Sequence, residues 1–212
     1  MKKGREMRIN VPPSSEHPAV FLRQLERSDA NDWYTYLTLP EVFEHTIWDL
    51  HSIEDLLPMF DAFDSPSVDS VRRLAIVENH SQQLVGTIGF HTLSNANRTS
   101  EIAYDIAPSH WGKGIAGAVC DAVTRWSFSA YGFVRVQATV LHTNARSENV
   151  LRRCHFQHEG LLRSYRMVRG TPRDFLLYSR LSTEQYKRGQ TLRDPRFFLR
   201  KIKKLELLKK PA

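Results

Sequence analysis

Apolar and polar residues alternate with a period of two in seven segments of the chain, which is typical of β-strands. The expected strands are residues 20–25, 72–77, 84–93, 99–107, 134–140, 156–168 and 174–181. Apolar spacing and capping residues predict helices at residues 30–37, 53–63, 112–131 and 144–153. The predicted order is β-α-α-β-β-β-α-β-α-β-β, an α/β (α+β) fold with about seven strands and no internal repeat.

The connections between these segments indicate how the strands pair. Turn residues at 78–81 and 94–97 join three strands in series, so these strands are expected to be antiparallel. The strand at 134–140 follows a helix and is expected to lie parallel to the strand before it. The prediction is a mixed, mostly antiparallel sheet with helices on both faces.

A length of 212 residues with 41% apolar residues is sufficient for one ordinary domain. Residues 1–18 are expected to form an extended arm outside the fold, residues 19–181 the domain, and residues 182–212 an extension. Cys120 and Cys154 stand apart and no Cys/His cluster has metal-ligand spacing, so we expect reduced thiols, a cytoplasmic location and no metal. No apolar run is long enough to span a membrane, and no signal core follows the first residues.

The positive charge of the chain is concentrated in its extension. Residues 182–212 contain ten Lys/Arg and three Asp/Glu, which accounts for the whole net charge of +7. Residues 193–210 are expected to form a basic helix with an apolar face made by Phe198, Ile202, Leu205 and Leu208. Two roles stay open for it: packing on the domain or another subunit, or binding an anionic partner such as ribosomal RNA.

The stretch from residue 101 to 118 combines a strand, a tight turn and a glycine-rich helix start. Gly112, Gly114 and Gly117 keep side chains away from the first backbone N–H groups of the helix. These N–H groups have no partner within the helix and favour anions such as phosphates. A dinucleotide fold is not expected, because the stretch lacks a βαβ context early in a parallel sheet. The alternative is that the glycines serve only the turn and packing.

Residues 111–116, Trp-Gly-Lys-Gly-Ile-Ala, resemble the pyrophosphate loop of the GNAT N-acetyltransferases, Gln/Arg-x-x-Gly-x-Gly/Ala. Trp111 takes the Gln/Arg place, Gly114 the first glycine and Ala116 the final small residue. Tryptophan in that place resembles the branch of ribosomal-protein N-terminal acetyltransferases (RimJ/RimL-type), where Tyr-Trp-Gly-Lys-Gly is common. The predicted order of elements over residues 20–181 is also similar to the GNAT fold.

A second motif supports the resemblance. Residues 142–156 are similar to the family pattern Asn-x-x-Ser-x-x-Val-Leu-x-x-x-Gly-Phe, with Asn144 and Ser147 in the first two named places. Two positions depart from the family. His155 replaces the usual glycine, which often needs a positive φ, and Leu151 stands where many relatives have a tyrosine that protonates the leaving thiolate.

The resemblance implies that acetyl-CoA lies between the strands at 101–107 and 134–140. The backbone N–H groups of Ile106 and Ala107 would face the thioester carbonyl, and Asn144 would bind the pantetheine arm or act only as an N-cap. Lys113 would assist the phosphates or remain solvated. The diphosphate would meet the N–H groups of Trp111, Gly112, Lys113, Gly114, Ile115 and Ala116.

For acetyl transfer, the amine must lose a proton and the leaving sulfur must gain one. Glu101 is the candidate base, with a pKa expected to be raised by partial burial. The alternatives are a surface glutamate at the start of a strand or an ion pair with Arg98. Ser147 is the candidate acid, with an ordinary exposed serine as the alternative. His45 and Trp48 lie where relatives bind the acceptor, although packing would equally explain them.

The sequence therefore indicates an acetyl-CoA-dependent N-acetyltransferase that acts on a primary amine, such as a protein N-terminus of a ribosomal protein. One alternative is an acetyltransferase for small-molecule amines or antibiotics. Another is a non-catalytic module that binds CoA or the ribosome. A monomer or a homodimer would suit each of these.

Overall fold

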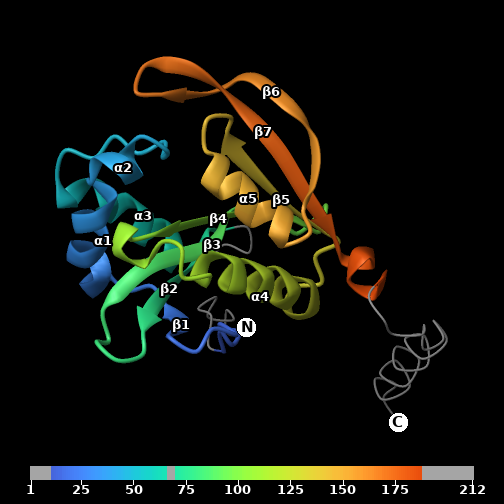
Figure 1. The fold of residues 1–212 in the computed structure, drawn as a ribbon, viewed down its shortest axis with the longest axis horizontal. Helices are drawn as coiled ribbons and strands as arrows, with labels where there is room; N and C mark the ends of the chain where they lie inside the picture. The colour runs from blue at the N-terminus through green and yellow to red at the C-terminus, as the bar shows by residue number, and fades with distance from the viewer. Residues whose placement is uncertain (1–10, 66–69, 188–212) are drawn as a thin grey trace, which may run out of the picture. The chain divides into compact units, whose positions relative to one another are not determined.

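The computed structural model describes residues 11–65 and 70–187. Its strands form one sheet in the order β1-β2-β3-β4-β5-β7-β6 (Figure 1). The strands are β1 (Val20–Gln24), β2 (Arg72–Glu78), β3 (Leu84–Ser94), β4 (Thr99–Ile106), β5 (Arg135–Leu141), β6 (Gln157–Val168) and β7 (Thr171–Leu181). β4 and β5 are parallel and the other neighbours are antiparallel. The mixed, mostly antiparallel sheet of seven strands expected from the sequence is confirmed.

The helices are α1 (Ala30–Leu37), α2 (Pro40–Phe43), α3 (Leu57–Asp64), α4 (Ile115–Ala130) and α5 (Ala145–Arg153). Short 3-10 turns occur at Arg27–Asp29, Ile53–Leu56, Pro108–His110 and Ser182–Lys187. The pattern did not predict α2, which is four residues long. Pro40 occupies the first turn of this helix, where proline needs no backbone hydrogen bond and its fixed φ suits the helix.

The sheet separates two apolar cores. Leu74 and Ile76 pack with residues of α4 and α5, whereas Ala75 and Val77 pack with residues of α1, α2 and α3. Successive side chains of a strand point to opposite faces, so α1–α3 cover one face and α4 and α5 the other. Figure 1 shows the same division of the helices. β2 is buried along almost its whole length because both faces are covered.

The sheet opens between β4 and β5. These strands pair only at Thr99–Arg135, Ser100–Val136 and Glu101–Gln137. Beyond this point β5 continues beside β7 as far as Leu141, and β4 continues beside β3. The backbone of β4 after Glu101 therefore has a paired side and an unpaired side. We call this opening the split.

A buried carboxylate on β4 makes an ion pair with β2 and hydrogen bonds with α1. The carboxylate of Asp105 pairs with Arg73 and accepts hydrogen bonds from Tyr36, Trp33 and Thr87. The Trp33 indole nitrogen lies 3.2 Å from it and the Thr87 hydroxyl 2.8 Å. These hydrogen bonds satisfy a charge that would be costly to bury alone, and they fix α1 against the strand.

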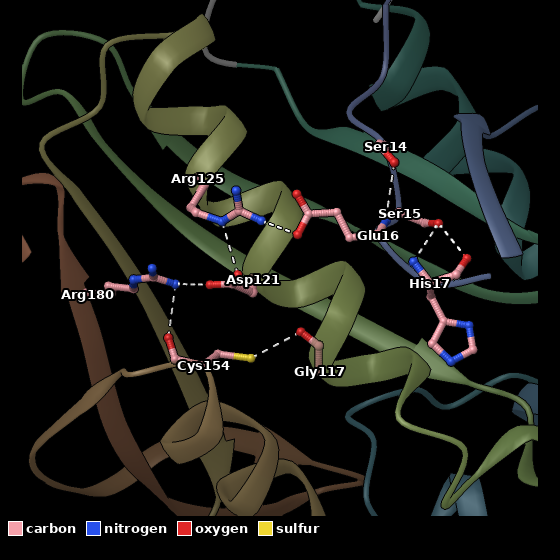
Figure 2. Close-up of polar contacts among 9 residues, drawn as sticks. All are labelled: Ser14, Ser15, Glu16, His17, Gly117, Asp121, Arg125, Cys154 and Arg180. Atoms are coloured by element: carbon pink, nitrogen blue, oxygen red, sulfur yellow. Dashed lines mark hydrogen bonds and ion pairs between the residues drawn. The ribbon is translucent and has the colours of Figure 1, made fainter. Parts of the chain in front are cut away.

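The described part of the N-terminal arm is attached to the domain, although it was expected to lie outside the fold. The side-chain amide of Asn79 donates to the carbonyl of Pro18 at 2.7 Å. Glu16 forms an ion pair of 2.5 Å with Arg125 on α4 (Figure 2). The basic helix expected at residues 193–210 lies outside the described residues. Among the described residues, no helix is long and apolar enough to cross a membrane.

Candidate active site

The loop between β4 and α4 leads into a helix start without a capping side chain. Gly112 and Gly114 have φ angles of 75° and 82°, in the left-handed region that favours glycine. Gly114 is the N-cap of α4, and no side chain caps the helix there. The first N–H groups of α4 therefore remain available, as an anion site requires. The helix begins at Ile115 and not at Gly112, because residues with a positive φ cannot continue a right-handed helix.

Two of the backbone N–H groups expected to contact acetyl-CoA have other partners. The N–H of Ala107 donates to the carbonyl of Val85 at 2.8 Å, and the N–H of Trp111 donates to the carbonyl of Pro108 at 3.0 Å. These two N–H groups are therefore engaged within the chain, so the proposed contacts are confined to the other groups. Since backbone groups alternate in direction along a strand, the N–H of Ile106 points to the other side of β4, toward the split.

The Trp111 side chain links the loop to both sides of the split. Its indole N–H donates to the carbonyl of Ile106 at 2.7 Å. The guanidinium of Arg146, on α5, lies 4.1 Å from the centre of a Trp111 ring. Arg146 thereby brings a positive charge to the glycine loop. Sequence reasoning missed this residue, although it lies inside the motif that contains Asn144 and Ser147.

Helix α5 presents the second motif beside β4. Oδ1 of Asn144 accepts from the backbone N–H of Ser147 at 3.0 Å, so Asn144 is an N-cap, as one interpretation expected. The Ser147 hydroxyl lies 3.0 Å from the hydroxyl of Tyr104 on β4, and the Tyr104 hydroxyl also donates to the Ser147 carbonyl at 3.2 Å. Burial raises the pKa of Tyr104 well above its usual range. Leu151 is buried in the core.

Glu101 lies where β4 and β5 separate, with its side chain only 4% exposed. Oε1 accepts hydrogen bonds from Thr139 at 2.6 Å, Arg166 at 2.8 Å and His91 at 3.1 Å, and Oε2 accepts one from Gln137 at 3.1 Å. Burial alone would raise the pKa of Glu101, but hydrogen bonds from His91, Thr139 and Gln137 outweigh it and lower the pKa to about 2. The expected rise toward neutrality is wrong.

The partners of Glu101 differ from the one considered in the sequence. Arg98 donates to the carbonyl of Gly132 at 2.8 Å and does not pair with Glu101. His91 is the extra residue of a β-bulge in β3, opposite Glu101, and its side chain is 30% exposed. Within the described residues, its Nδ1 has no hydrogen-bond partner. A bulge leaves no clear mark in the alternation of a strand, so nothing in the sequence singled out His91.

The segment after α2 lies against the turn of the β6–β7 hairpin, as the arrangement in Figure 1 also indicates. Arg169 donates to the carbonyls of Thr46 and Trp48, both at 3.1 Å, and its guanidinium lies 4.1 Å from the centre of the Phe43 ring. Trp48 also packs edge-on against Trp33. Nδ1 of His45 is buried and has no partner among the described residues. The segment after α2 and the turn of the β6–β7 hairpin together form a candidate acceptor surface, and Arg169 joins them.

No metal site is formed by the part of the chain that the structure describes. Residues 11–65 and 70–187 contain no group of three His, Cys, Asp or Glu side chains close enough to bind an ion. The thiols of Cys120 and Cys154 are both buried.

A family model described as an acetyltransferase (GNAT) domain matches residues 19–157. YoaA of Bacillus subtilis (strain 168), named an uncharacterized N-acetyltransferase, is 35% identical over 169 residues, covering 79% of this chain and 96% of YoaA. The putative ribosomal N-acetyltransferase YdaF of the same organism is 36% identical over 101 residues, covering 48% of this chain and 55% of YdaF.

Solved structures share the fold. Spermidine N-acetyltransferase from Vibrio cholerae, in complex with CoA and spermine, superposes with a TM-score of 0.68 at 20% identity, covering 78% of this chain and 96% of that one. The family itself is shown by the model that matches residues 19–157 and by the 35% identity to YoaA. The chain therefore belongs to the GNAT acetyltransferase family, as an N-acetyltransferase with acetyl-CoA as its acetyl donor.

Proposed function

We propose that this N-acetyltransferase acts on the primary amine of a protein N-terminus, such as that of a ribosomal protein. The observation that carries the choice of acceptor is Arg169, which lies against the segment after α2. Arg166 pairs with Glu101, so these two charges cancel, whereas Arg169 makes no ion pair with another described residue. This uncompensated cation would repel a polyamine more strongly than a peptide with a single ammonium group. The likeness to YdaF supports the same choice.

A small-molecule amine is the second candidate. Glu44 and Asp49 are exposed on the segment that follows α2, and such carboxylates would attract a polycation. The solved structure of spermidine N-acetyltransferase from Vibrio cholerae is a complex with CoA and spermine. The choice between the two candidates therefore depends on whether the positive or the negative side chains at the candidate acceptor surface dominate. Rates measured with different acceptors can decide this.

The acceptor experiment measures release of the CoA thiol with the full chain and saturating acetyl-CoA. The panel contains short peptides with different N-terminal residues, spermidine, spermine and an aminoglycoside. We expect at least one peptide to have a kcat/KM about tenfold above every small amine, which corresponds to about 1.4 kcal/mol. A preference for spermidine or spermine would overturn the peptide proposal. No turnover with any amine, despite uptake of acetyl-CoA, would favour a module that only binds CoA or the ribosome.

The residues proposed to bind acetyl-CoA are those whose backbone N–H groups at the start of α4 have no partner within the helix. The N–H groups of Gly112, Lys113, Gly114, Ile115 and Ala116 are proposed to bind its diphosphate. The positive end of α4 and the charges of Lys113 and Arg146 would add to this attraction. These groups fit a diphosphate because a Cβ atom built at Gly112 or Gly114 meets nothing within 4 Å, so the approach is open.

The pantetheine arm is proposed to lie in the split. The N–H of Ile106 faces this side of β4, and Asn144 reaches it from α5. Because Oδ1 of Asn144 caps the helix, its Nδ2 group is the one that would donate to the arm. Acetyl-CoA supplies the reactive thioester, and the chain supplies orientation and proton transfer.

Proton removal from the amine is proposed to involve Glu101 through His91. With a pKa of about 2 and four donors around it, the carboxylate is a poor proton acceptor. If Nε2 of His91 carries the hydrogen that Glu101 accepts, the free Nδ1 can take the amine proton directly or through water. Glu101 then acts as a positioning residue, in the way that a carboxylate orients histidine in catalytic triads. His45 and Trp48 are proposed to contact the acceptor.

Ser147 is proposed to protonate the leaving sulfur. Its hydroxyl can donate to the sulfur, and it lies 3.0 Å from the hydroxyl of Tyr104, which stays protonated because burial raises its pKa. Leu151 cannot supply this proton. Ser147→Ala should lower kcat and leave acetyl-CoA affinity unchanged, as measured by steady-state kinetics and calorimetry. An unchanged kcat would remove Ser147 from proton transfer.

The basic extension at residues 182–212 is proposed to hold the enzyme on ribosomal RNA or a similar anionic surface. Ten Lys/Arg against three Asp/Glu in this segment support the proposal. Retention of the full chain on purified ribosomes should fall steeply between low and high salt. A chain that ends at Leu181 should show little retention at either salt concentration. Equal retention of both chains would overturn the proposal.

A further inference from the structure

The arm before β1 contacts the loop that precedes α4. Nε2 of His17 lies 3.0 Å from the carbonyl oxygen of Lys113. Nδ1 of the same ring lies 3.2 Å from the backbone nitrogen of Ala19, which has a hydrogen to donate. Because Nδ1 accepts this hydrogen, the ring proton is assigned to Nε2, and His17 donates to Lys113. Both ring nitrogens are engaged, one within the arm and the other on the loop.

The arm is itself anchored on either side of this contact. The side-chain amide of Asn79 donates to Pro18, and the backbone N–H of Asn79 donates to the carbonyl of Ala19 at 2.8 Å. Glu16 pairs with Arg125 on α4, and Figure 2 shows this pair beside His17. His17 therefore extends from a backbone attached to both the sheet and α4, and not from a free end.

We propose that His17 is a positioning residue for the diphosphate of acetyl-CoA. In a trans peptide, the C=O and the following N–H point in opposite directions. By holding the carbonyl of Lys113 toward the arm, His17 directs the N–H of Gly114 away from the arm, to the side where the first turn of α4 is open. Gly114 has no side chain to limit its backbone, so this peptide needs an external restraint.

This inference rests on the diphosphate site proposed above and adds to it a residue from far along the chain. A loop amide binds a phosphate well only when its direction is already set, because ordering it on binding reduces affinity. His17 would set the direction before acetyl-CoA binds. His17 would then belong to the co-substrate site, although it lies outside both sequence motifs.

Calorimetry with the full chain tests this role. The two ligands are acetyl-CoA and 3′-phosphoadenosine 5′-diphosphate, which has the diphosphate but no pantetheine. For His17→Ala, the Kd of both ligands should rise roughly three- to tenfold, which is the effect of losing one hydrogen bond. Glu16→Gln is the matched control, because Glu16 contacts Arg125 and not the loop. It should leave both Kd values unchanged, and both variants should melt within a few degrees of the wild-type chain.

Each other outcome has a distinct meaning. Unchanged Kd values for His17→Ala would overturn the positioning role. So would a loss of affinity for acetyl-CoA without a loss for the nucleotide, because the effect would then lie away from the diphosphate. An equal loss in Glu16→Gln would point to the arm as a whole and would also overturn it. A wild-type chain that binds neither ligand would contradict the diphosphate site itself.

Discussion

The carboxylate of Glu101 remains charged although it is almost completely buried. Desolvation favours the neutral acid, but donors from β3, β5 and β6 surround the charge and stabilise it. Such a group holds other side chains in place better than it exchanges protons. The imidazole of His91, whose Nε2 lies 3.1 Å from Oε1 of Glu101, is the group that the proposed mechanism uses as the proton acceptor.

The lowered pKa of Glu101 predicts how stability depends on pH. The folded value of about 2 lies below the ordinary 4.5, so the stabilisation is present above about pH 4.5 and is lost as the pH falls toward 2. Its size is about 3 kcal/mol, from 1.36 kcal/mol per pH unit. Glu101→Gln should be less stable at neutral pH and lose less free energy of unfolding between pH 4.5 and 2. Urea titrations at several pH values measure this.

The matched control is Glu41→Gln, at an exposed position in α2. This variant should follow the wild-type pH dependence of unfolding. Equal pH dependence in the wild-type chain and Glu101→Gln would mean that Glu101 is not held ionised by its neighbours.

His91→Gln should lower kcat/KM for the best acceptor. Without a proton acceptor, the rate should fall roughly 100-fold, while the Kd of acetyl-CoA stays unchanged. The charged groups that face His91 are Glu101 and Arg166, and both remain in this variant. Thr92→Ala, at the exposed next position of β3, is the control and should retain the wild-type kcat/KM. A wild-type kcat/KM in His91→Gln would exclude His91 as the base.

At the scale of elements, α4 begins and ends with glycines of nearly equal conformation. Gly114 at the start has a φ of 82°, and Gly132 just beyond the end has a φ of 68°. An alanine at either position would be strained by about 1–2 kcal/mol, the cost of a left-handed conformation. Only Gly114 belongs to the proposed diphosphate site. Substitutions at the two glycines can therefore distinguish an effect on folding stability from an effect on acetyl-CoA binding.

Gly114→Ala and Gly132→Ala should lower the free energy of unfolding by similar amounts. Only Gly114→Ala should weaken acetyl-CoA binding, by about tenfold, because strain at this residue turns the loop amides away from a common direction. Chemical denaturation and calorimetry on both variants measure the two effects. Equal Kd values in the two variants would show that the loop does not bind the diphosphate.

Regular elements could be predicted from the sequence because their signals are local. The alternation in β4 and the glycine after α4 mark their boundaries within one or two residues. Helix α2 was missed because four residues contain too little periodicity. The partners of Glu101 were missed because Thr139 and Arg166 lie 38 and 65 positions away, on strands whose side-chain register no local pattern specifies. Part of the site was thus predictable, and its electrostatics were not.

At the scale of the domain, the β6–β7 hairpin and the segment after α2 are far apart in sequence and meet through Arg169. Arg169→Ala should raise the KM for the acceptor about three- to tenfold, because the loss of two charged hydrogen bonds frees the segment that contains His45 and Trp48. The kcat and the Kd of acetyl-CoA should not change. Steady-state kinetics with the acceptor varied measure the effect.

Arg163→Ala provides the control on the same hairpin. Arg163 is exposed and makes no ion pair or side-chain hydrogen bond with another described residue. Its variant should keep the wild-type KM. If both variants, or neither, raise the KM, Arg169 does not shape the acceptor surface.

β4 connects nearly every part of this arrangement. One face carries Glu101 and Asp105, the other carries Tyr104, and the carbonyl of Ile106 accepts the indole hydrogen of Trp111. A slip of this strand by one residue against β3 would exchange its two faces. The carboxylates of Glu101 and Asp105 would then lie in the apolar core under α4. The Tyr104 hydroxyl would lose its contact with Ser147. Catalytic turnover therefore also indicates that β4 pairs with β3 in the correct register. A chain with the wrong register would show no acetyl transfer even if it were compact.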